Sequence, residues 1–493
     1  MRARRSVVVC GVVFTVLGVA VLACVGDEPS AVVTPGVGPA VDGGSEASTG
    51  DETSASCTAP KTSCGDACVD TSSDPANCGA CGTTCNGTTC FEGICGGDKV
   101  TAVGTGDTFS CALRASGTVW CWGSNSVAQL GARVVPDEMS CDGVKCRPLP
   151  VRVEGVAKVA TIAVGYGSAC AVTQQGEAFC WGRNASGELG DVPVENCGSP
   201  CVTKPTKLPF AEPIAEVSLG LTGSCIRTLV GQDVYCFGNN GLGLRGDGTA
   251  DGGAPAVPLK VALPGPASSI SVGAGPKTHA CARVGNAAYC WGANGNQQIR
   301  ASSTATCPSG ACEPTPFLIP SLGVVSQVIA GDGHTCVRAA AGVQCWGYQG
   351  YGIGNGTASP ITIAGLAGAT EIAGKDRHVC ARLADGQIRC FGASTDARLG
   401  IVETDLALNC SASPCKTAPQ VVPGLSGSSG SSMSAFAGTV AVRFDGAVVA
   451  WGTARGGLLG HLPATEGDVT CQPPDGGIAG PCSATPRAIP TLP

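Results

Sequence analysis

The chain has 493 residues and a formal net charge of −7, and only 14% of its residues are charged. Its 74 glycines and 33 prolines indicate many turns and argue against long solvent-exposed helices. The negative charge excludes the basic footprint of a nucleic-acid-binding protein, so no nucleic-acid partner is expected. The 32 cysteines favour an oxidising compartment.

The N-terminus carries the pattern of an export signal. Three arginines precede an apolar run at residues 7–22, which is too short for an ordinary membrane-spanning helix. The run ends in Val21-Leu22-Ala23-Cys24, which resembles a bacterial lipobox. The resemblance implies that residues 1–23 are a cleaved signal peptide and that Cys24 receives a lipid. An exported protein, anchored to the outer membrane or cell surface through this lipid alone, is therefore expected. The alternative is an ordinary secretory signal with an incidental cysteine.

Two segments of unusual composition follow. Residues 24–56 contain acids but no lysine or arginine, so we expect a disordered acidic linker. Residues 57–96 hold eight cysteines, and a segment this short needs disulfides because it cannot bury a sufficient core. Their connectivity cannot be chosen from the sequence. Cys78-x-x-Cys81 could indicate zinc or redox chemistry, but structural disulfides are favoured in an exported chain.

The cysteine spacing of this second segment has a counterpart in a known family. The string CGDACVDTSSDPANCGACGTTCNGTTCFEGIC is similar to the cysteine-rich module of plant stigma-specific proteins. The resemblance implies an extracellular disulfide module without a defined activity.

Residues 97–493 repeat a unit of similar length. An aromatic-Gly pair marks each unit: Trp122-Gly123, Trp181-Gly182, Phe237-Gly238, Trp291-Gly292, Trp346-Gly347, Phe391-Gly392 and Trp451-Gly452. The pattern of each unit predicts four short strands, which is the number of strands in one propeller blade. We therefore predict an all-β, seven-bladed propeller of four-stranded blades. The aromatic side chain is expected to pack between neighbouring blades, because both faces of a blade are covered.

A hairpin inside each unit can be checked by counting. With Gly117 in a three-residue turn, Cys111 faces Cys121 on a non-hydrogen-bonded pair, where side chains are closest. In the seventh unit Val440 and Ala450 replace both cysteines together, as paired residues should. The predicted hairpin disulfides join Cys111 to Cys121, Cys170 to Cys180, Cys225 to Cys236, Cys281 to Cys290, Cys336 to Cys345 and Cys380 to Cys390.

A second series of cysteines lies in the loops of the repeats. The predicted loop disulfides join Cys141 to Cys146, Cys197 to Cys201, Cys307 to Cys312, Cys410 to Cys415 and Cys471 to Cys482. With Cys24 lipidated and Cys10 discarded with the signal peptide, no odd thiol remains. A catalytic cysteine is therefore not expected.

Units such as VSQVIAGDGHTCVRAAAGVQCWGYQGYGIGNGT resemble the regulator of chromosome condensation repeat. That family implies a seven-bladed propeller, and the final residues 486–493 look like a strand that closes the ring with the N-terminal unit. The founding member is an exchange factor for a nuclear GTPase, but an exported lipoprotein would not meet that partner. The family also includes secreted bacterial inhibitors of β-lactamases, although their contact residues cannot be placed here.

Two groups of polar residues suggest chemistry. His279, His334 and His378 each stand two residues before a repeat cysteine, and a structural position in the repeat is favoured over a metal or catalytic ring. Asp247 and Asp251 lie in a glycine-rich loop but provide too few ligands for calcium. No catalytic residue, metal or cofactor is predicted.

The sequence therefore predicts a non-catalytic, monomeric binding protein whose partner is a protein or a polysaccharide. The expected contact surface is the set of cysteine-stapled loops, residues 132–148, 191–208, 300–316, 401–420 and 461–486. The alternatives are a secreted enzyme inhibitor, or a hydrolase or lyase. Clustered acids or histidines with perturbed pKa at one mouth of the propeller would favour the enzyme. An aromatic loop patch would favour protein binding.

Overall fold

The structure is a computed structural model of the chain. It describes residues 57–58, 61–85, 90–91, 94–95, 98–253, 257–303, 305–401, 410, 414–425, 432–443, 446–461, 468–471 and 480–489. The predicted signal peptide, Cys24 and the acidic linker lie outside the described residues. No helix among the described residues has the length and apolar character needed to cross a membrane.

The cysteine-rich segment contains two small antiparallel sheets, which pair β1 (Thr62–Cys64) with β2 (Ala67–Val69) and β3 (Cys90–Phe91) with β4 (Ile94–Cys95). Strands this short leave little apolar surface to bury. Disulfides hold this segment together instead, among them Cys57–Cys68, Cys64–Cys81 and Cys78–Cys90. The structure thus selects a connectivity that the sequence left open.

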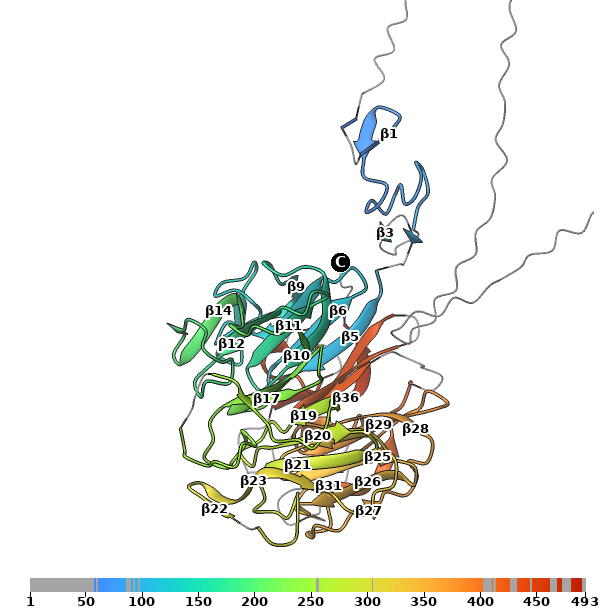
Figure 1. Cartoon of the computed structure of the whole chain (residues 1–493). Helices are drawn as coiled ribbons and strands as arrows, with labels where there is room; N and C mark the ends of the chain where they lie inside the picture. The colour runs from blue at the N-terminus through green and yellow to red at the C-terminus, as the bar shows by residue number, and fades with distance from the viewer. Residues whose placement is uncertain are drawn as a thin grey trace, which may run out of the picture. The chain divides into compact units, whose positions relative to one another are not determined.

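The described residues from 98 onward form seven consecutive antiparallel sheets, the blades of the predicted propeller (Figure 1). Blades one and two contain β5 (Val100–Thr105), β6 (Phe109–Arg114), β7 (Val119–Ser124), β8 (Met139–Cys141), β9 (Val144–Arg152), β10 (Val159–Val164), β11 (Ser168–Thr173), β12 (Ala178–Arg183), β13 (Glu195–Asn196) and β14 (Pro200–Lys207). Blades three and four contain β15 (Ile214–Leu219), β16 (Gly223–Thr228), β17 (Val234–Gly238), β18 (Leu259–Lys260), β19 (Ala267–Val272), β20 (His279–Val284), β21 (Ala287–Ala293), β22 (Ala305–Cys307) and β23 (Gly310–Leu318).

The remaining blades follow the same order, and two short 3-10 turns, η1 and η2, lie in blades six and seven. Blades five to seven contain β24 (Val325–Ala330), β25 (His334–Ala339), β26 (Gly342–Gly347), β27 (Ile361–Thr362), β28 (Ala369–Ala373), β29 (His378–Leu383), β30 (Ile388–Ala393), η1 (Thr395–Ala397), β31 (Cys415–Val421), β32 (Met433–Ala435), β33 (Gly438–Val442), β34 (Val448–Thr453), η2 (Arg455–Gly457), β35 (Val469–Cys471) and β36 (Gly480–Ala488).

Among the described residues, blades three, five and six have the predicted four strands. Blades one, two, four and seven carry a fifth strand at the outer edge. In each of these blades a cysteine-stapled loop folds back as a hairpin, as β8 does on β9, where Cys141 pairs with Val144. These blades also contain the four predicted strands, and the additional fifth strand was not predicted because the loops lack the long alternating pattern by which a strand is recognised.

The hairpin register agrees with the counting argument. Cys111 lies opposite Cys121, and Leu113 lies opposite Val119. Gly117 adopts φ +75°, the left-handed conformation that the three-residue turn requires. In the seventh blade Val440 lies opposite Ala450, as the paired replacement of both cysteines predicts.

The glycine after each aromatic residue is explained by a close backbone approach. Gly123 adopts φ +105°, and a Cβ there would lie 2.5 Å from the carbonyl oxygen of Thr108 and 2.7 Å from the Cα of Phe109. The first-to-second strand connection passes directly over this position. Any side chain at this position would therefore push the connection away from the strand.

The aromatic residues pack between blades, which confirms the prediction. Trp122 on β7 is 0% exposed, and its indole nitrogen donates to the carbonyl oxygen of Leu458 in blade seven at 2.8 Å. Trp181 in blade two donates in the same way to Gln129 in blade one at 2.9 Å. Three further tryptophans repeat this contact with the preceding blade: Trp291, Trp346 and Trp451.

Side chains of the innermost strands join each blade to the next. The Ser218 hydroxyl accepts from the Val272 amide at 2.9 Å, and the Ser271 hydroxyl accepts from the Ala330 amide at 3.0 Å. An edge strand leaves backbone donors unpaired, and a side chain from the neighbouring blade satisfies them here.

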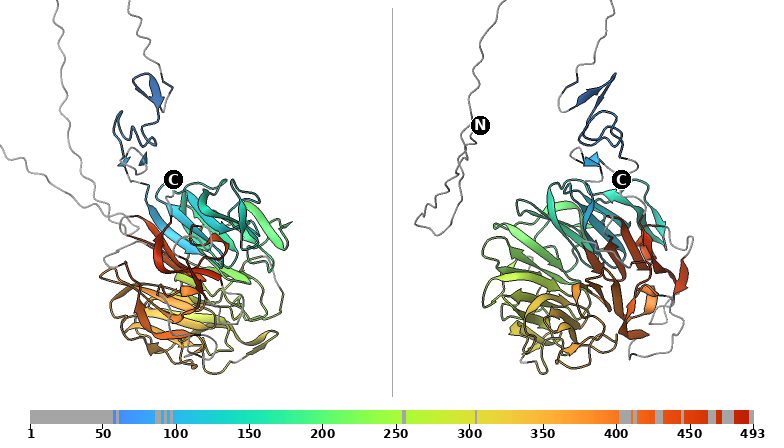
Figure 2. Two further views of the ribbon diagram at one scale, coloured as in Figure 1. Left: turned by 180° about the vertical axis from the view of Figure 1, so that it is seen from behind. Right: turned by 90° about the vertical axis from the view of Figure 1, so that its right-hand side faces the viewer.

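The described strands close the ring without a shared sheet, so the expected pairing with the N-terminal unit was wrong for residues 486–488, and residues 490–493 lie outside the described residues. β36 pairs with β34 and β35 of its own blade, and β5 pairs with β6 of the first. The strands of blades one and seven lie side by side (Figure 2). They meet instead through side chains, since the Ser432 and Ser434 hydroxyls accept from the Val103 and Thr105 amides at 3.2 and 3.1 Å. Each blade is therefore complete in one continuous stretch of sequence.

Candidate functional site

The structure brings together the two cysteines of each predicted hairpin pair as a disulfide, with Cα atoms 4.0–4.1 Å apart. These bonds join Cys111 to Cys121, Cys170 to Cys180, Cys225 to Cys236, Cys281 to Cys290, Cys336 to Cys345 and Cys380 to Cys390. The hairpin cysteines are buried between blades, so these bonds stabilise the blades and leave no thiolate for chemistry.

The predicted loop pairs are also disulfides, with Cα atoms 5.8–6.0 Å apart. They join Cys141 to Cys146, Cys197 to Cys201, Cys307 to Cys312, Cys410 to Cys415 and Cys471 to Cys482. Each bond closes a short loop beside the outermost strands of its blade. The loop cysteines therefore hold the shape of the insertions and contribute no reactive thiol.

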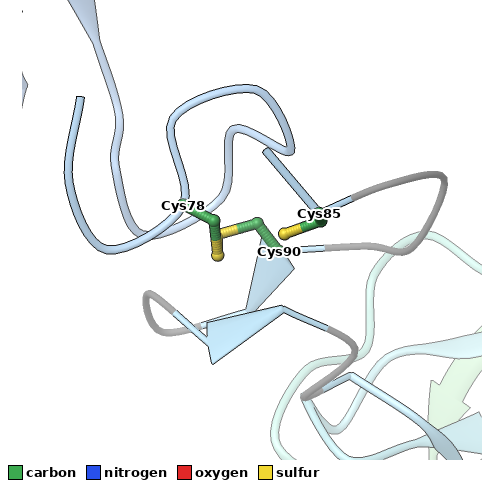
Figure 3. A group of neighbouring side chains, drawn as sticks. All are labelled: Cys78, Cys85 and Cys90. Atoms are coloured by element: carbon green, nitrogen blue, oxygen red, sulfur yellow. A yellow bond between two sulfur atoms is a disulfide. The ribbon is translucent and has the colours of Figure 1, made fainter. Parts of the chain in front are cut away.

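The cysteine-rich segment gathers three sulfur atoms, from Cys78, Cys85 and Cys90, close enough to hold a metal (Figure 3). Cys78 and Cys90 are joined by a disulfide, and Cys85 is itself disulfide-bonded. A metal needs thiolates, which a disulfide does not provide. The cluster therefore belongs to a disulfide module and does not suit a metal.

The three repeat histidines occupy a buried position between blades. His279 and His378 are 0% exposed, and their Nε2 atoms lie 2.8 Å from the hydroxyls of Thr335 and Thr439 in the next blade. Burial lowers the pKa of His279 to about 3 and that of His334 to about 4. Neutral histidines spread over three blades contribute to packing, in agreement with the favoured structural interpretation.

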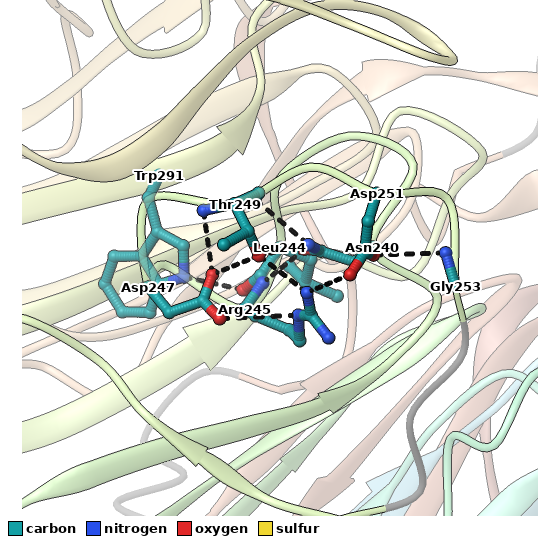
Figure 4. Close-up of polar contacts among 8 residues, drawn as sticks. All are labelled: Asn240, Leu244, Arg245, Asp247, Thr249, Asp251, Gly253 and Trp291. Carbon is teal, nitrogen blue, oxygen red and sulfur yellow. Dashed lines mark hydrogen bonds and ion pairs between the residues drawn. The ribbon is translucent and has the colours of Figure 1, made fainter.

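The glycine-rich loop of blade three contains its own cation (Figure 4). Arg245 is 5% exposed; its Nη2 donates to Asp251 Oδ2 at 2.7 Å, and its Nε lies 3.7 Å from Asp247 Oδ2. The guanidinium group thus neutralises the carboxylates that a calcium ion would need. Arg245 was not considered with this loop, although it directly precedes the motif.

One end of the propeller axis gathers the loops of several blades. Because successive strands are antiparallel, the first-to-second and third-to-fourth strand connections lie at the same end of each blade. The Lys375 amide donates to the Ala435 carbonyl at 3.1 Å, the Ala274 amide donates to the Lys375 carbonyl at 3.2 Å, and Lys375 Nζ donates to the Val164 carbonyl at 3.0 Å. The blade-six loop therefore ties blades two, four and seven together at this end.

A cavity of about 710 Å³ opens at this end of the axis. Two of the five predicted contact loops line it: residues 132–148 supply Asp142 and Val144, and residues 461–486 supply Gly480 and Pro481. The described residues of the other three predicted loops do not line it. The remaining lining comes mainly from the short connections near the axis and from the 3-10 turns η1 and η2, which the sequence reasoning did not select.

A buried ion-pair network forms one wall of the cavity. Arg398 is 4% exposed, and it donates to Asp376 Oδ2 at 3.0 Å and to Asp396 Oδ2 at 3.1 Å. Arg377 Nε lies 3.6 Å from Asp376 Oδ1. These acids are therefore balanced by neighbouring arginines.

Asp107 lies in the same cavity outside this network of ion pairs. Its burial, and then the charge of Asp376, raise the pKa of its carboxyl group to about 6, although a hydrogen bond with Tyr166 opposes this shift. The charge of Asp107 in turn raises the pKa of Tyr166 to about 12. The folded protein therefore disfavours the charged form of Asp107, and charging this carboxyl group lowers the free energy of unfolding.

Aromatic rings accompany these charges at the same end of the axis. Tyr166 and Phe436 line the cavity in an edge-to-face pair with ring centroids 6.1 Å apart. Tyr348 and Tyr351, in blade five, form a second such pair at 4.9 Å, and Lys277 Nζ lies 4.2 Å from the centroid of the Tyr348 ring. We call Tyr166, Tyr348 and Tyr351 the tyrosine set.

A sequence signal for this site did exist. Asp107, Asp332 and Asp376 each stand two residues before the buried repeat position that His334 and His378 occupy in blades five and six. Burial, and then Asp376, also raise the pKa of Asp332, whose carboxylate accepts from the Tyr351 hydroxyl at 3.2 Å. The recurrence of an acid at this slot places carboxylates around the axis, because the slot follows the innermost strand.

The raised pKa of Asp107 predicts a pH-dependent stability. The folded state binds this proton more tightly than the unfolded state, so wild-type stability falls as the pH rises from about 4 through about 6. Asp107→Asn cannot titrate, so it removes this pH-dependent loss of stability. The free energy of unfolding of the variant, relative to that of wild type, should rise by up to about 3 kcal/mol between pH 4 and pH 7.5. Urea unfolding at both pH values measures the difference. Asp385→Asn, which changes the same charge at a hairpin turn at the opposite end, should show no such rise. An equal pH dependence in both variants would contradict the assignment.

The comparisons with known families agree with this architecture. Residues 100–129 and 159–188, and in a second match residues 116–172 and 175–226, match the regulator of chromosome condensation (RCC1) repeat. Residues 40–98 match the stigma-specific STIG1-like protein family.

Curated relatives share part of their length with this chain. It is 30% identical over 254 residues to the mitochondrial RCC1 domain-containing protein RUG3 of Arabidopsis thaliana, covering 50% of this chain and 53% of the relative. It is also 30% identical over 188 residues to the secretion-regulating guanine nucleotide exchange factor of Mus musculus, covering 34% of this chain and 38% of the relative. The chain thus spans about half or less of the length of these two relatives.

Solved structures share the fold at low sequence identity. Human WBSCR16 superposes with a TM-score of 0.60 at 17% identity, covering 76% of this chain and 95% of that chain. Prp20p from Saccharomyces cerevisiae superposes with a TM-score of 0.59 at 17% identity, covering 80% and 88%. This chain is therefore a seven-bladed propeller protein that contains regulator of chromosome condensation repeats, preceded in the sequence by a segment similar to the stigma-specific STIG1-like family.

Proposed function

We propose that this chain is an exported, lipid-anchored, non-catalytic protein that binds a protein partner with the loop-bearing end of its propeller. The supporting observation is the tyrosine set, three of the chain's five tyrosines, which accompanies Lys277 and several arginines at that end. Tyrosine and arginine are enriched among the residues that dominate binding energy at protein interfaces. An interface of this composition supports protein binding over polysaccharide binding.

The proposed location rests on the cysteines. Six buried hairpin disulfides and five loop disulfides would not persist in a reducing cytosol. The lipobox-like Val21-Leu22-Ala23-Cys24 supplies the proposed anchor at the outer membrane or cell surface. The nucleotide exchange named for the mouse relative is not carried over, because an exported protein would not meet a cytosolic GTPase.

A second candidate function is favoured by Asp107. A carboxyl group with a pKa raised to about 6 inside a cavity is a typical general acid or base. Its neighbour Asp376 is fixed in an ion pair with Arg398, which leaves Asp107 without an obvious second catalytic group among the described residues. A hydrolase or lyase therefore ranks below binding, and so does an inhibitor, which would use the same surface.

The test is capture of a partner by the whole oxidised chain from envelope and secreted fractions of the source cell. Tyr348→Ser combined with Tyr351→Ser should weaken capture of a protein partner by at least about tenfold. Leu229→Ser combined with Val230→Ser removes exposed apolar groups at a hairpin turn of the opposite end, and capture should be unchanged. A polysaccharide partner, or equal effects of the two double variants, would overturn the proposal.

A further inference from the structure

The cavity contains a partly buried carboxylate, Asp107, that forms no direct ion pair with another described residue. Asp376 and Asp396 are paired with Arg398. Among the described residues, no arginine or lysine nitrogen lies within 4.0 Å of the Asp107 carboxylate. An unpaired, partly buried carboxylate is costly, so its presence in a cavity indicates a ligand that pairs with it.

The charges that line the cavity indicate the sign and the magnitude of the charge that this ligand carries. Four carboxylates line it, against three guanidinium groups: Asp107, Asp142, Asp376, Asp396, Arg377, Arg398 and Arg455. One positive charge would balance the set, so a single cationic side chain, rather than an anion, suits the cavity.

The rings beside Asp107 suit a long cationic side chain. Tyr166 and Phe436 present aromatic surface next to the carboxylate, and Tyr166 is 37% exposed. A lysine side chain packs its methylene groups on such rings and keeps its ammonium group at the polar end. A guanidinium prefers both oxygens of a carboxylate, whereas this carboxylate already interacts with Tyr166.

We propose that Asp107, Tyr166 and Phe436 form a binding site for a single lysine side chain of a protein partner, with Asp107 pairing with its ammonium group. This inference rests on the proposed function and names the chemistry that the partner presents. It assigns the cavity a role in recognition and gives the unpaired carboxylate its counter-ion.

The electrostatics of the cavity add a pH dependence. Burial, and then the charge of Asp376, raise the pKa of Asp107, while the Tyr166 hydroxyl, Arg398 and Arg455 lower it. A proton and a lysine ammonium group compete for the same carboxylate. Binding should therefore strengthen as the pH rises through about 6, where Asp107 loses its proton.

The experiment is calorimetric titration of the whole oxidised chain with a pentalysine peptide at about 0.15 M salt, which screens long-range attraction. The matched probe is the same peptide acetylated on every lysine, which should not bind. Asp107→Asn should weaken pentalysine binding by at least about tenfold, and Tyr166→Leu should weaken it severalfold. Asp385→Asn makes the same change in net charge at the opposite end and should leave the affinity unchanged. Wild-type affinity should fall between pH 7.5 and pH 5.

Three results would overturn the inference: no measurable pentalysine binding, equal binding of the acetylated peptide, or equal effects of Asp107→Asn and Asp385→Asn. The capture experiment remains independent, because its variants, Tyr348→Ser and Tyr351→Ser, lie outside the cavity lining. Capture that depends on Tyr348 and Tyr351 but not on Asp107 would reject the lysine site and keep protein binding.

Discussion

Replacing Trp122 with alanine is expected to lower the free energy of unfolding by about 3–5 kcal/mol. The side chain is 0% exposed and packs among Val442, Leu458 and Leu459 of the last blade. Its indole nitrogen also donates to the Leu458 carbonyl, which the variant leaves without that donor. Because the described strands of the first and last blades share no sheet, this contact is part of what closes the ring. Urea unfolding under oxidising conditions measures the change.

The same strand supplies a matched control. Trp120 stands two residues earlier on β7, is only partly buried, and has no hydrogen-bond partner for its indole nitrogen among the described residues. Trp120→Ala should therefore cost much less than Trp122→Ala. Similar losses for the two variants would show that the ring is not closed by the packing described here.

Replacing only one cysteine of the blade-six hairpin disulfide should lower the free energy of unfolding more than replacing both cysteines. Cys380 and Cys390 are both 0% exposed. Losing the cross-link costs about 3 kcal/mol for a loop of this size. Cys390→Ser also leaves a buried hydroxyl, which adds about 1–3 kcal/mol. The double variant Cys380→Val with Cys390→Ala copies the pair found in blade seven and should cost only the first amount. Urea unfolding of the three proteins gives the comparison.

Blade seven provides the converse experiment. Val440 and Ala450 lie opposite each other in the register of the cysteine pairs. Val440→Cys with Ala450→Cys should form a disulfide, visible by mass spectrometry as the loss of two hydrogens, and should raise the unfolding midpoint. If the cysteines stayed reduced, or if the double variant of blade six lost more stability than the single one, the paired role of these positions would be rejected.

Local sequence patterns were sufficient to predict the structure of the blades. The turn glycine Gly117 and the separation of Cys111 from Cys121 set the hairpin register, because a one-residue slip would move every side chain to the other face. The recurring aromatic-Gly pair marked both the inter-blade tryptophans and the close backbone approach at Gly123. These features lie within one unit, and seven copies of the unit reinforce the same interpretation.

The candidate site was only partly accessible in this way. Asp107, Tyr166, Asp376 and Phe436 occupy the same slot of the repeat in blades one, two, six and seven, but the repeat does not show that these four positions line one cavity. Arg398 decides which acids are neutralised, and only the folded ring places it beside Asp376. The ring closure was mispredicted for a similar reason, since pairing between β36 and its own blade depends on the preceding hairpin.

The sequence by itself therefore determined the number of blades, the register of their hairpins and the residues that pack between them, because these follow from short-range spacing. Only the tertiary structure decided which loops share the axial cavity, which of its charges remain unpaired and how the first blade meets the last. Those properties depend on distances between residues more than 300 positions apart, such as Val103 and Ser432, which the closure of the ring alone creates.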